Sequence, residues 1–485
     1  MAEQFHNYIH GEWVPAFSGG RTFTSINPAN KDDVIGAFAA SDREDVKRAI
    51  QAAHAALPQW RALSAPMRGQ YLWRAADILQ SRAEEVARAM VRENGKTITE
   101  ARGEVMRGVM LLRYYGTEGL HSVGEVIPSV KPGTLLFTTR QPLGVVSIIT
   151  PWNFPIAIPL WKIAPALVFG NTVVFKPASL TPHCGVLLTQ IFAEAGLPPG
   201  VLNLVTGSGS GMGEELVKNP FVRGVSFTGS NTVGREIAAW AANVNVKYQL
   251  EMGGKNCTIT LPDADLDQAV ELTVRGAFGY AGQKCTATSR AIVVGDIVEE
   301  FTERVVARTQ SLKVGDPNEE DTFVPPVVSQ AQRDSIMDNI QMGRMEGGKL
   351  LCGGQVLKGG LYDRGFYVQP TVFTNVRADM VLACEEIFGP VLAILPAKDV
   401  DEALQLANDC RYGLSASLFT RSVNAVLTYL DRIDVGVVKI NGETAGVEPQ
   451  APFGGMKDSS SHSREQGRAA LEFFTELKTV YVEKS

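Results

Sequence analysis

The sequence lacks the features of a membrane, secreted or nucleic-acid-binding protein. It has no apolar run long enough to span a membrane, and its first residues, MAEQFHNYIHGEWVPAF, do not combine a basic segment with an unbroken apolar one. The net charge is −6 and no block of lysine and arginine stands out, so nothing favours binding to a phosphate backbone. We therefore expect a cytoplasmic protein with neither a membrane nor a nucleic acid as a partner.

Cysteine is scarce, and its spacing argues against two of its common uses. The six cysteines contain no C-x-x-C pair, and a chain of 485 residues is too large to need disulfide bonds for its stability. We therefore expect no bound metal and no disulfide framework. Because free cysteines are usually small core residues, we give that interpretation to five of the six, namely Cys184, Cys257, Cys352, Cys384 and Cys410.

The length and the hydrophobic pattern predict two α/β lobes. A chain of 485 residues, 45% hydrophobic and 20% charged, exceeds what one core usually organises. From residue 144 the β-branched runs GVVSIIT, NTVVFKP, VLNLVTG, VRGVSFTG and KYQLEMGG alternate with segments of helical length, which predicts a parallel sheet covered by helices. A second series of this kind begins near residue 291 and predicts the second lobe.

Two further segments lie outside this alternation. The first hundred or so residues are predicted to be amphipathic helices, with one capping box formed by Ser41 and Glu44 and another by Ser81 and Glu84. Residues 121–140, rich in threonine and apolar alternation, are predicted to form a β-ribbon with the C-terminal run FFTELKTVYVE. This ribbon is expected to lie outside both lobes.

The ends of the predicted strands carry candidate ligand-binding residues, because ligands of open α/β sheets bind beyond the carboxyl ends of the strands. Lys176 in VVFKPASLTP follows a strand, where a cation can hold ribose hydroxyls or a 2′-phosphate. The run VSFTGSNTVG ends a strand at Phe227 and turns through Gly229 and Ser230 into a helix, so backbone amides can approach a pyrophosphate. A plain β–α turn explains that run equally well. The glycine-rich turn GSGSGMG does not match G-x-G-x-x-G, and at most places Gly209 near the ligand.

Three residues have the chemistry of an acyl-transfer site. Cys285 in GQKCTATSR lies among polar residues and glycine, and a thiolate there can form a thiohemiacetal with an aldehyde and then a thioester. Lys284 beside it is a candidate to lower the pKa of the thiol. Glu251, in YQLEMGGKN at a strand end, is a candidate general base. The turn TPWNFP, held by two prolines, can aim the amide of Asn153 at an oxyanion.

Each of these residues has an ordinary structural explanation when taken alone, but their order along the chain is distinctive. The motifs TPWNFP, KPASLTP, FTGSNTVG, EMGGKN, GQKCTA, EEIFGP and PFGGMK closely resemble the aldehyde dehydrogenase superfamily through almost the whole chain. The resemblance implies a Rossmann-like cofactor domain over residues 1–120 and 141–252 and an α/β catalytic domain over 253–455. It also implies an oligomerisation β-ribbon, over 121–140 and 471–485, that bridges the subunits of a homodimer or homotetramer.

The resemblance also assigns roles to particular residues. Cys285 is implied to be the nucleophile, Glu251 the general base that hydrolyses the thioester, and Asn153 the oxyanion-stabilising amide. Among the cofactor contacts, Ser230 is implied to hold the pyrophosphate and Glu386 the nicotinamide ribose. The full set implied to bind or line the cofactor is Thr150, Trp152, Lys176, Ser179, Gly209, Phe227, Gly229, Ser230, Met252, Glu386 and Phe388.

One departure from the family pattern concerns the choice of cofactor. Many NAD-specific members carry a glutamate three residues after the ribose-binding lysine, where it repels a 2′-phosphate. The corresponding position here, three residues after Lys176, is Ser179. Because the negative charge is missing, we expect NADP to be used at least as well as NAD.

The substrate is indicated by a narrower likeness. The segments QAPFGGMKDSSSHSREQG and GQKCTATSR are most similar to the branch of the family that oxidises α-ketoglutaric semialdehyde (2,5-dioxopentanoate) to 2-oxoglutarate. Trp161 replaces the arginine with which the succinate-semialdehyde branch binds a carboxylate, so Lys284 is a candidate for that role. Phe154 and Trp161 are predicted to wall the substrate channel, although positions in an ordinary core explain them equally well.

Two other functions remain open at this point. A CoA-acylating semialdehyde dehydrogenase shares the fold and the cysteine but commonly lacks the general base, so Glu251 favours hydrolysis. A non-enzymatic protein that kept the scaffold has no physical need for Cys285, Glu251 and Asn153 together. Oxidation of an aldehyde to a free acid is therefore the preferred function.

Overall fold

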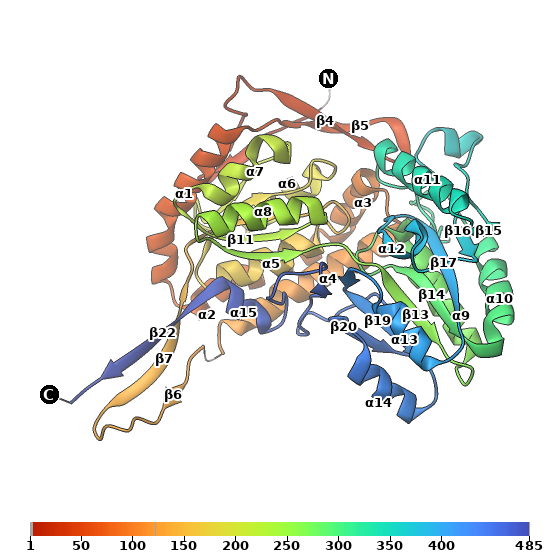
Figure 1. The fold of residues 1–485 in the computed structure, drawn as a ribbon. Helices are drawn as coiled ribbons and strands as arrows, with labels where there is room; N and C mark the ends of the chain where they lie inside the picture. Colours follow the sequence, from red (N-terminus) through yellow and green to blue (C-terminus); the bar gives the residue numbers. More distant parts are fainter. Residues whose placement is uncertain (1–2, 122, 485) are drawn as a thin grey trace.

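The computed structural model describes residues 3–121 and 123–484, which form two α/β lobes and a protruding ribbon (Figure 1). Residues 1, 2, 122 and 485, which belong to the predicted cofactor-domain and ribbon segments, lie outside the described residues. The α/β class and the two largely parallel sheets confirm the architecture predicted from the alternation of β-branched runs with helical segments.

The first lobe is built on a seven-stranded sheet, five of whose strands are parallel. Strand β8 pairs with β9 on one side and with β11 on the other, so the chain reverses its direction of winding between β8 and β11. Ligands bind at such a switch point, beyond the carboxyl ends of the strands. The strands in spatial order are β12 (Lys247–Glu251), β11 (Val222–Thr228), β8 (Val145–Ile149), β9 (Thr172–Lys176), β10 (Leu202–Leu204), β2 (Asn7–Ile9) and β3 (Glu12–Val14).

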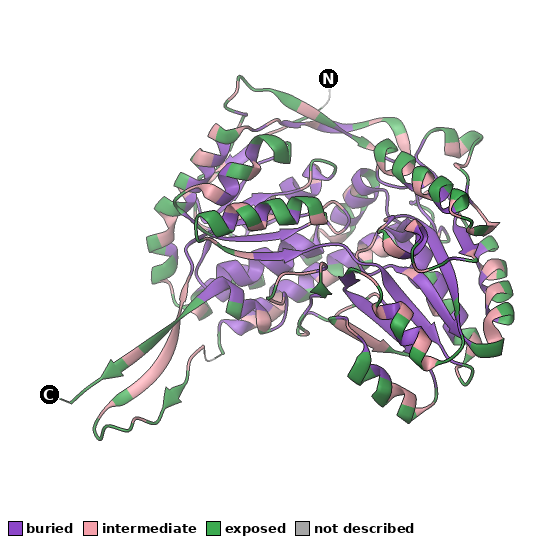
Figure 2. Ribbon diagram, viewed as in Figure 1, coloured by how far each residue is buried: buried purple, intermediate pink, exposed green. Residues whose placement is uncertain are grey.

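Helices cover both faces of this sheet and bury two apolar cores. One core includes side chains of α1 (Arg43–Ala62), α7 (Gly209–Lys218) and α8 (Asn231–Asn243). The larger core on the other face includes those of α2 (Ala65–Ser81), α3 (Ala83–Asn94), α4 (Ile98–Glu118), α5 (Ala157–Val168) and α6 (Pro182–Glu194). Figure 2 shows the strands buried between these layers and the outer helix surfaces exposed.

The second lobe is also a seven-stranded sheet covered by helices, and it has a separate apolar core. Its sheet is parallel apart from β15, and its order is β15 (Lys349–Cys352), β16 (Thr371–Thr374), β17 (Val391–Ala397), β14 (Thr288–Val294), β13 (Asn256–Thr260), β19 (Ser415–Phe419) and β20 (Val437–Ile440). Its helices are α9 (Leu266–Phe278), α10 (Val298–Gln310), α11 (Gln330–Met345), α12 (Val381–Cys384), α13 (Val400–Asn408) and α14 (Val423–Arg432).

A ribbon of three strands extends away from both lobes (Figure 1). The C-terminal strand β22 (Thr475–Val482) pairs antiparallel with β7 (Leu135–Pro142), and β6 (Val126–Ile127) pairs with the other edge of β7. The short helix α15 (Ala469–Phe474) precedes β22, so the first part of the FFTELKTVYVE run is helical.

The prediction that the first hundred residues are helical is wrong for the first forty. They form a hairpin of β4 (Thr22–Asn27) and β5 (Asn30–Ala39), joined by β1 (Gln4–Phe5), besides β2 and β3. Strands β1, β2 and β3 have only two or three residues, too few to show an alternating pattern. Strand β5 is longer, but it begins with the polar run NKDD, which is typical of a turn.

Both predicted capping boxes are also wrong. The cap of α1 is Asp42, because the hydroxyl of Ser41 is hydrogen-bonded to Asn7 instead. Ser81 lies at the end of α2, where its hydroxyl donates to the carbonyl of Ile78. The following helix, α3, begins at Ala83 without a side-chain cap.

In the part of the chain that the structure describes, no helix is both long and apolar enough to cross a membrane. Within the same residues, no group of three or more His, Cys, Asp or Glu side chains is arranged to hold a metal ion.

Candidate active site

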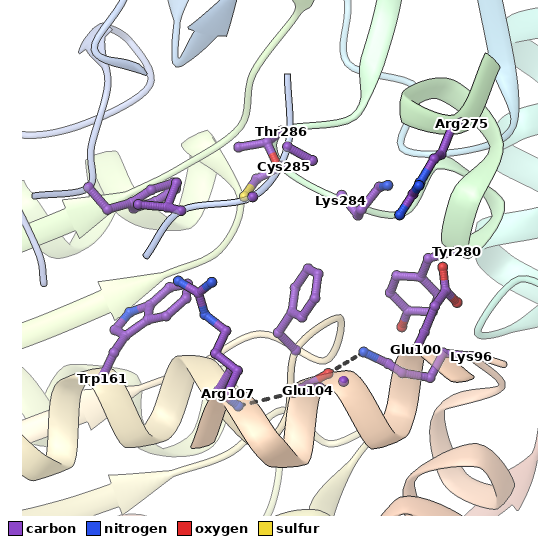
Figure 3. Close-up of a pocket in the computed structure, with 17 residues that line it drawn as sticks. Lys96, Glu100, Glu104, Arg107, Trp161, Arg275, Tyr280, Lys284, Cys285 and Thr286 are labelled. Carbon is purple, nitrogen blue, oxygen red and sulfur yellow. Dashed lines mark hydrogen bonds and ion pairs between the residues drawn. The ribbon is translucent and has the colours of Figure 1, made fainter. Parts of the chain in front are cut away.

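Two cavities meet at Cys285, which lines both. The small cavity, about 220 Å³, lies at the switch point of the first sheet and is lined by the segments that follow β8, β11 and β12. Gln332, Glu386 and Phe388 of the second lobe close its other side. The large cavity, about 430 Å³, lies between α4, α5 and the segment that leads into Cys285 (Figure 3). The geometry therefore gives one thiol access to two separate binding spaces.

Cys285 follows a strained turn. In η1 (Gly279–Gly282), Tyr280 has a φ of 55° and Ala281 a φ of 50°, a left-handed conformation that is costly for residues with a side chain and clusters at functional sites. Burial raises the pKa of the Cys285 thiol to about 12, and the carboxylates of Glu386 and Glu251 act in the same direction. The thiol is therefore protonated at neutral pH and must lose its proton before it can act as a nucleophile.

The geometry does not support Lys284 as the group that lowers the pKa of this thiol. Its side chain points toward Arg275 rather than toward Cys285 (Figure 3), because consecutive side chains of this turn leave the backbone in different directions. The groups that shift the pKa of the thiol do not include Lys284. The pKa of Lys284 itself is lowered by burial, and Glu100 is the charge that most opposes this shift.

A buried ion pair supports the turn that carries Asn153. Lys96 and Glu104 are in contact, and each side chain is 1% exposed. The ammonium of Lys96 also donates to the carbonyl of Asn153 at 2.9 Å. Glu104 Oε1 accepts the backbone N–H groups of Ile156 at 2.8 Å and Ala157 at 3.0 Å. The pair therefore fixes the turn on both sides of Asn153.

The amide of Asn153 reaches the loop that carries Cys285. Asn153 Nδ2 donates to the carbonyl of Gln283 at 3.2 Å, and Asn153 and Cys285 both line the small cavity. Since an amide nitrogen carries two hydrogens, one N–H remains for an oxygen that becomes negative during a reaction at Cys285.

Glu251 is a buried carboxyl at the end of β12, 1% exposed. Its Oε2 accepts a hydrogen bond from Ser460 Oγ, while its Oε1 has no hydrogen-bond partner among the described residues. Burial raises the pKa of Glu251 well above the ordinary carboxyl range, and the nearby Glu465 raises it further. A carboxyl with a raised pKa and an oxygen without a partner can take a proton from water.

Six of the predicted cofactor residues line the small cavity. Glu386 Oε1 accepts the N–H of Gly254 at 3.0 Å, and burial raises the pKa of Glu386 to about 7. Phe388 has a left-handed φ of 54°, and its ring meets the ring of Trp152 edge-on with 5.3 Å between centroids. The six residues are Trp152, Gly229, Ser230, Met252, Glu386 and Phe388.

The other five predicted cofactor residues lie in the same lobe but outside the lining of the small cavity. Lys176, the last residue of β9, is buried, and burial lowers its pKa to about 8. Its Nζ donates to the carbonyl of Pro177 at 3.0 Å. Ser179 is exposed three residues later. The remaining three are Thr150 directly after β8, Gly209 at the start of α7, and Phe227 within β11.

The three predicted substrate residues, Phe154, Trp161 and Lys284, all line the large cavity. Trp161 is fixed by a hydrogen bond of 2.7 Å from its Nε1 to Glu465. Helix α4 adds Glu100 and Arg107 to the lining, although no motif in the sequence marks either residue.

The match to known proteins extends over almost the whole chain. The model of the aldehyde dehydrogenase family matches residues 13–480. The chain belongs to the aldehyde dehydrogenase family. This membership confirms the resemblance read from the order of the motifs.

Individual members of the family are similar over nearly their full lengths. The α-ketoglutaric semialdehyde dehydrogenase of Bacillus subtilis (strain 168) is 52% identical to this aldehyde dehydrogenase, over 98% of this chain and 97% of the relative. The 2,5-dioxopentanoate dehydrogenase of Saccharolobus solfataricus is 43% identical, over 97% of this chain and 98% of the relative. The crystal structure of an NAD-dependent aldehyde dehydrogenase from Sinorhizobium meliloti, 35% identical, has a TM-score of 0.96 and covers 99% of this chain and 95% of that chain.

Several supports of the site in this aldehyde dehydrogenase were missed by sequence reasoning. Lys96 and Glu104 look like the charged face of a surface helix, because eight residues separate them and no pattern marks them as buried. Ser460 lies in the polar run DSSSHS, which reads as a solvated turn. Gln332 is the fourth such residue, and it belongs to a helix more than forty residues beyond Cys285.

Proposed function

We propose that this aldehyde dehydrogenase uses Cys285 to oxidise 2,5-dioxopentanoate to 2-oxoglutarate, with a nicotinamide cofactor and with release of the free acid. The observation that carries the proposal is the meeting of two cavities at one half-buried thiol. The choice of substrate is supported by the names of the relatives from B. subtilis and S. solfataricus, which share 52% and 43% of their residues with this chain.

The residues of the small cavity fit a nicotinamide dinucleotide. Ser230 precedes α8 without capping its N-terminus through its side chain, which leaves backbone N–H groups for a phosphate. The buried hydroxyl of Thr228 has no hydrogen-bond partner among the described residues. A Cβ atom at Gly253 would lie 2.1 Å from Glu386 Oε2, so glycine is needed to keep that carboxylate beside the cavity. When bound, the cofactor supplies the acceptor for the hydride.

Cys285 and Asn153 carry the first half of the reaction. Cys285 Sγ passes its proton to water in the site and attacks the aldehyde carbon, which forms a thiohemiacetal with a negative oxygen. The free N–H of Asn153 Nδ2 stabilises that oxygen, and one such donor contributes about 10²- to 10³-fold in rate. Loss of a hydride from the same carbon then leaves a thioester on Cys285.

Glu251 carries the second half. It takes a proton from a water molecule, the resulting hydroxide adds to the thioester carbonyl, and the thiolate of Cys285 leaves as the acid forms. The unpartnered Oε1 of Glu251 supports this role over a purely structural one. Because transfer to CoA needs no base for water, the same carboxyl favours hydrolysis over the CoA-acylating alternative.

The surroundings of Lys176 support the use of NADP at least as well as NAD. Burial alone lowers the pKa of Lys176, and no carboxylate contributes to the shift. The exposed residue three positions later is Ser179, so no side-chain charge there repels a 2′-phosphate. An extra phosphate would give the buried ammonium a counter-charge, which favours binding.

We also propose how the chain is divided among tasks. Residues 1–120 and 141–252 form the cofactor domain, 253–455 the catalytic domain, and 121–140 and 471–485 a ribbon that joins copies into a homodimer or homotetramer. The ribbon protrudes (Figure 1) and exposes apolar side chains, which water disfavours unless they are covered. They include Leu135, Leu477, Tyr481 and Val482. Sedimentation of the full chain tests this assembly, and a monomer would contradict it.

Single-turnover kinetics of Glu251→Gln test the proposed chemistry. The variant is expected to release one equivalent of reduced cofactor per subunit from 2,5-dioxopentanoate and then stop, because the thioester forms but is not hydrolysed. The control, Cys285→Ala, should show no burst. Rapid acyl-CoA formation by the wild type with little free acid would overturn the hydrolytic mechanism, and absence of a burst would place the action of Glu251 before hydride transfer.

A further inference from the structure

The large cavity is unusually rich in positive charge for a space lined mainly by apolar and aromatic side chains. Four cationic side chains contribute to its lining (Figure 3): Lys96, Arg107, Arg275 and Lys284. Burying a cation is costly unless an anion compensates it. The carboxylates near each cation therefore show which of the four has charge to spare for a ligand.

Two of the four cations are in contact with a carboxylate of the protein: Lys96 contacts Glu104, and Arg275 contacts Glu443 at 2.7 Å. Arg107 and Lys284 differ, because neither has a carboxylate within 4.0 Å among residues 3–121 and 123–484. A more distant carboxylate acts on each of them, Glu104 on Arg107 and Glu100 on Lys284. The one side-chain hydrogen bond of Arg107 is to a neutral group, from Nη2 to Gln466 Oε1 at 3.0 Å.

The position of Arg107 suits an anion inside the cavity. Its side chain rises from α4 beside Trp161, and its guanidinium points into the space below Cys285 (Figure 3). The guanidinium carbon lies 5.9 Å from the centre of the Trp161 ring. Burial lowers the pKa of Arg107, which shows that water does not fully solvate its charge. Gln466, held by the loop before α15, fixes one edge of the guanidinium and leaves its other N–H groups free to bind a ligand.

We propose that Arg107 binds the carboxylate of the aldehyde substrate while Cys285 attacks the aldehyde at the other end. This inference rests on the proposed function, because it concerns the same reaction, and it names the residue that selects aldehydes bearing a carboxylate. Arginine presents paired N–H groups that match the two oxygens of a carboxylate. Lys284, the candidate from the sequence, points toward Arg275, and its ammonium lacks the paired N–H groups of an arginine.

Two aldehydes of equal chain length test the proposal. 5-Oxopentanoate carries the carboxylate and pentanal does not, while the reacting group is the same in both. Arg107→Gln is expected to lower kcat/KM for 5-oxopentanoate about 10- to 100-fold, the range for one lost charged hydrogen-bonding partner. The value for pentanal should stay within about threefold, because the chemistry at Cys285 is untouched.

Matched variants separate this role from general effects of charge and folding. Arg113→Gln removes a positive charge from the same helix at a half-exposed position outside the cavity, where Arg113 pairs with Asp77, and should leave both aldehydes unaffected. Lys284→Gln should change the two aldehydes equally. Arg107→Lys keeps the charge without the paired N–H groups, and should lose part of the preference for 5-oxopentanoate even if Arg107→Gln folds poorly.

A second readout needs no turnover. Glutarate, a dicarboxylate of the same length, should slow the alkylation of Cys285 by iodoacetamide in the wild type and in Arg113→Gln. The protection should be weaker in Arg107→Gln and in Arg107→Lys. Equal protection in all four proteins would overturn the proposal.

The failures of the two proposals are distinguishable. A wild type that oxidises pentanal as efficiently as 5-oxopentanoate would refute both the substrate class and the role of Arg107. A wild type that prefers 5-oxopentanoate, with a preference that survives in Arg107→Gln, would keep the proposed substrate class and refute the role of Arg107. If Lys284→Gln, and not Arg107→Gln, loses the preference for 5-oxopentanoate, the role of Arg107 is refuted and Lys284 is the residue that binds the carboxylate.

Discussion

The buried pair of Lys96 and Glu104 gives a quantitative test of how the N-terminal helices support the site. Glu104→Gln removes one charge and leaves the ammonium of Lys96, 1% exposed, without its counter-charge. Breaking a buried pair in this way costs about 3–5 kcal/mol. The rings of Phe154 and Tyr280, each 4.4 Å from Lys96 Nζ, are present before and after the change and do not offset the loss. We therefore expect a loss of about 3 kcal/mol in the free energy of unfolding.

The double variant Lys96→Met/Glu104→Gln provides the control. Removing both members of a buried pair is often close to neutral, so the double variant should lie within about 1 kcal/mol of the wild type, the limit typical of tolerated core changes. Urea unfolding followed by fluorescence measures the differences, provided the slope m is unchanged. A double variant as unstable as Glu104→Gln would show that the two side chains are not coupled.

The pair should also influence catalysis, because its members hold the backbone on both sides of Asn153. Glu104→Gln is expected to lower kcat by about 10- to 100-fold through a shift in the oxyanion donor, since misplacement by about 1 Å is enough for such losses. Because unfolded protein would also lower the apparent kcat, kcat is measured at a temperature at which the variant is still folded. An unchanged kcat in a destabilised variant would refute the idea that this pair positions the turn.

Two further predictions concern pH and the cofactor. Ser460→Ala removes the hydrogen bond that favours the charged form of Glu251, so the pKa of Glu251 should rise further. The part of the pH profile in which kcat increases with pH should then move to higher pH. The pH profile of thioester hydrolysis measures this shift, and a profile that does not move or moves to lower pH would contradict it. Ser179→Glu places a negative charge three residues after Lys176 and should lower kcat/KM for NADP at least about tenfold, or 1.4 kcal/mol, while sparing NAD. A wild-type kcat/KM for NAD tenfold above that for NADP would refute the expected cofactor preference.

The features that could be predicted from the sequence are those that depend on patterns of neighbouring residues. The runs that became β8 to β12 are apolar throughout, because both faces of a parallel sheet are covered, and this made them visible. The order of short motifs identified Cys285, Glu251 and Asn153 together, although each alone resembles many unimportant residues. The N-terminal strands β1 and β2 were missed because two or three residues are too few to show a period.

The supports of the site could not be predicted, because they depend on contacts between distant segments. Ser460 reaches Glu251 across 209 positions of the chain, and Gln466 reaches Arg107 across 359. Sequence reasoning searched for the cation of a carboxylate-binding site near Cys285 and found Lys284. The residue that the fold offers, Arg107, lies on a helix that resembles an ordinary outer layer, with apolar and charged residues at helical spacing.

The arrangement of the two cavities implies that substrate choice and chemistry can change independently. Cys285 lines both spaces, whereas Asn153 and Glu386 line only the small cavity and Arg107 and Trp161 only the large one. A substitution of Arg107 or Trp161 therefore alters which aldehyde is held, while the donors that stabilise charge at the reacting carbon stay in place. The thiol of Cys285, with its raised pKa, is the shared part. That shared part is where a change should affect every aldehyde equally, and this contrast is what the comparison of 5-oxopentanoate with pentanal measures.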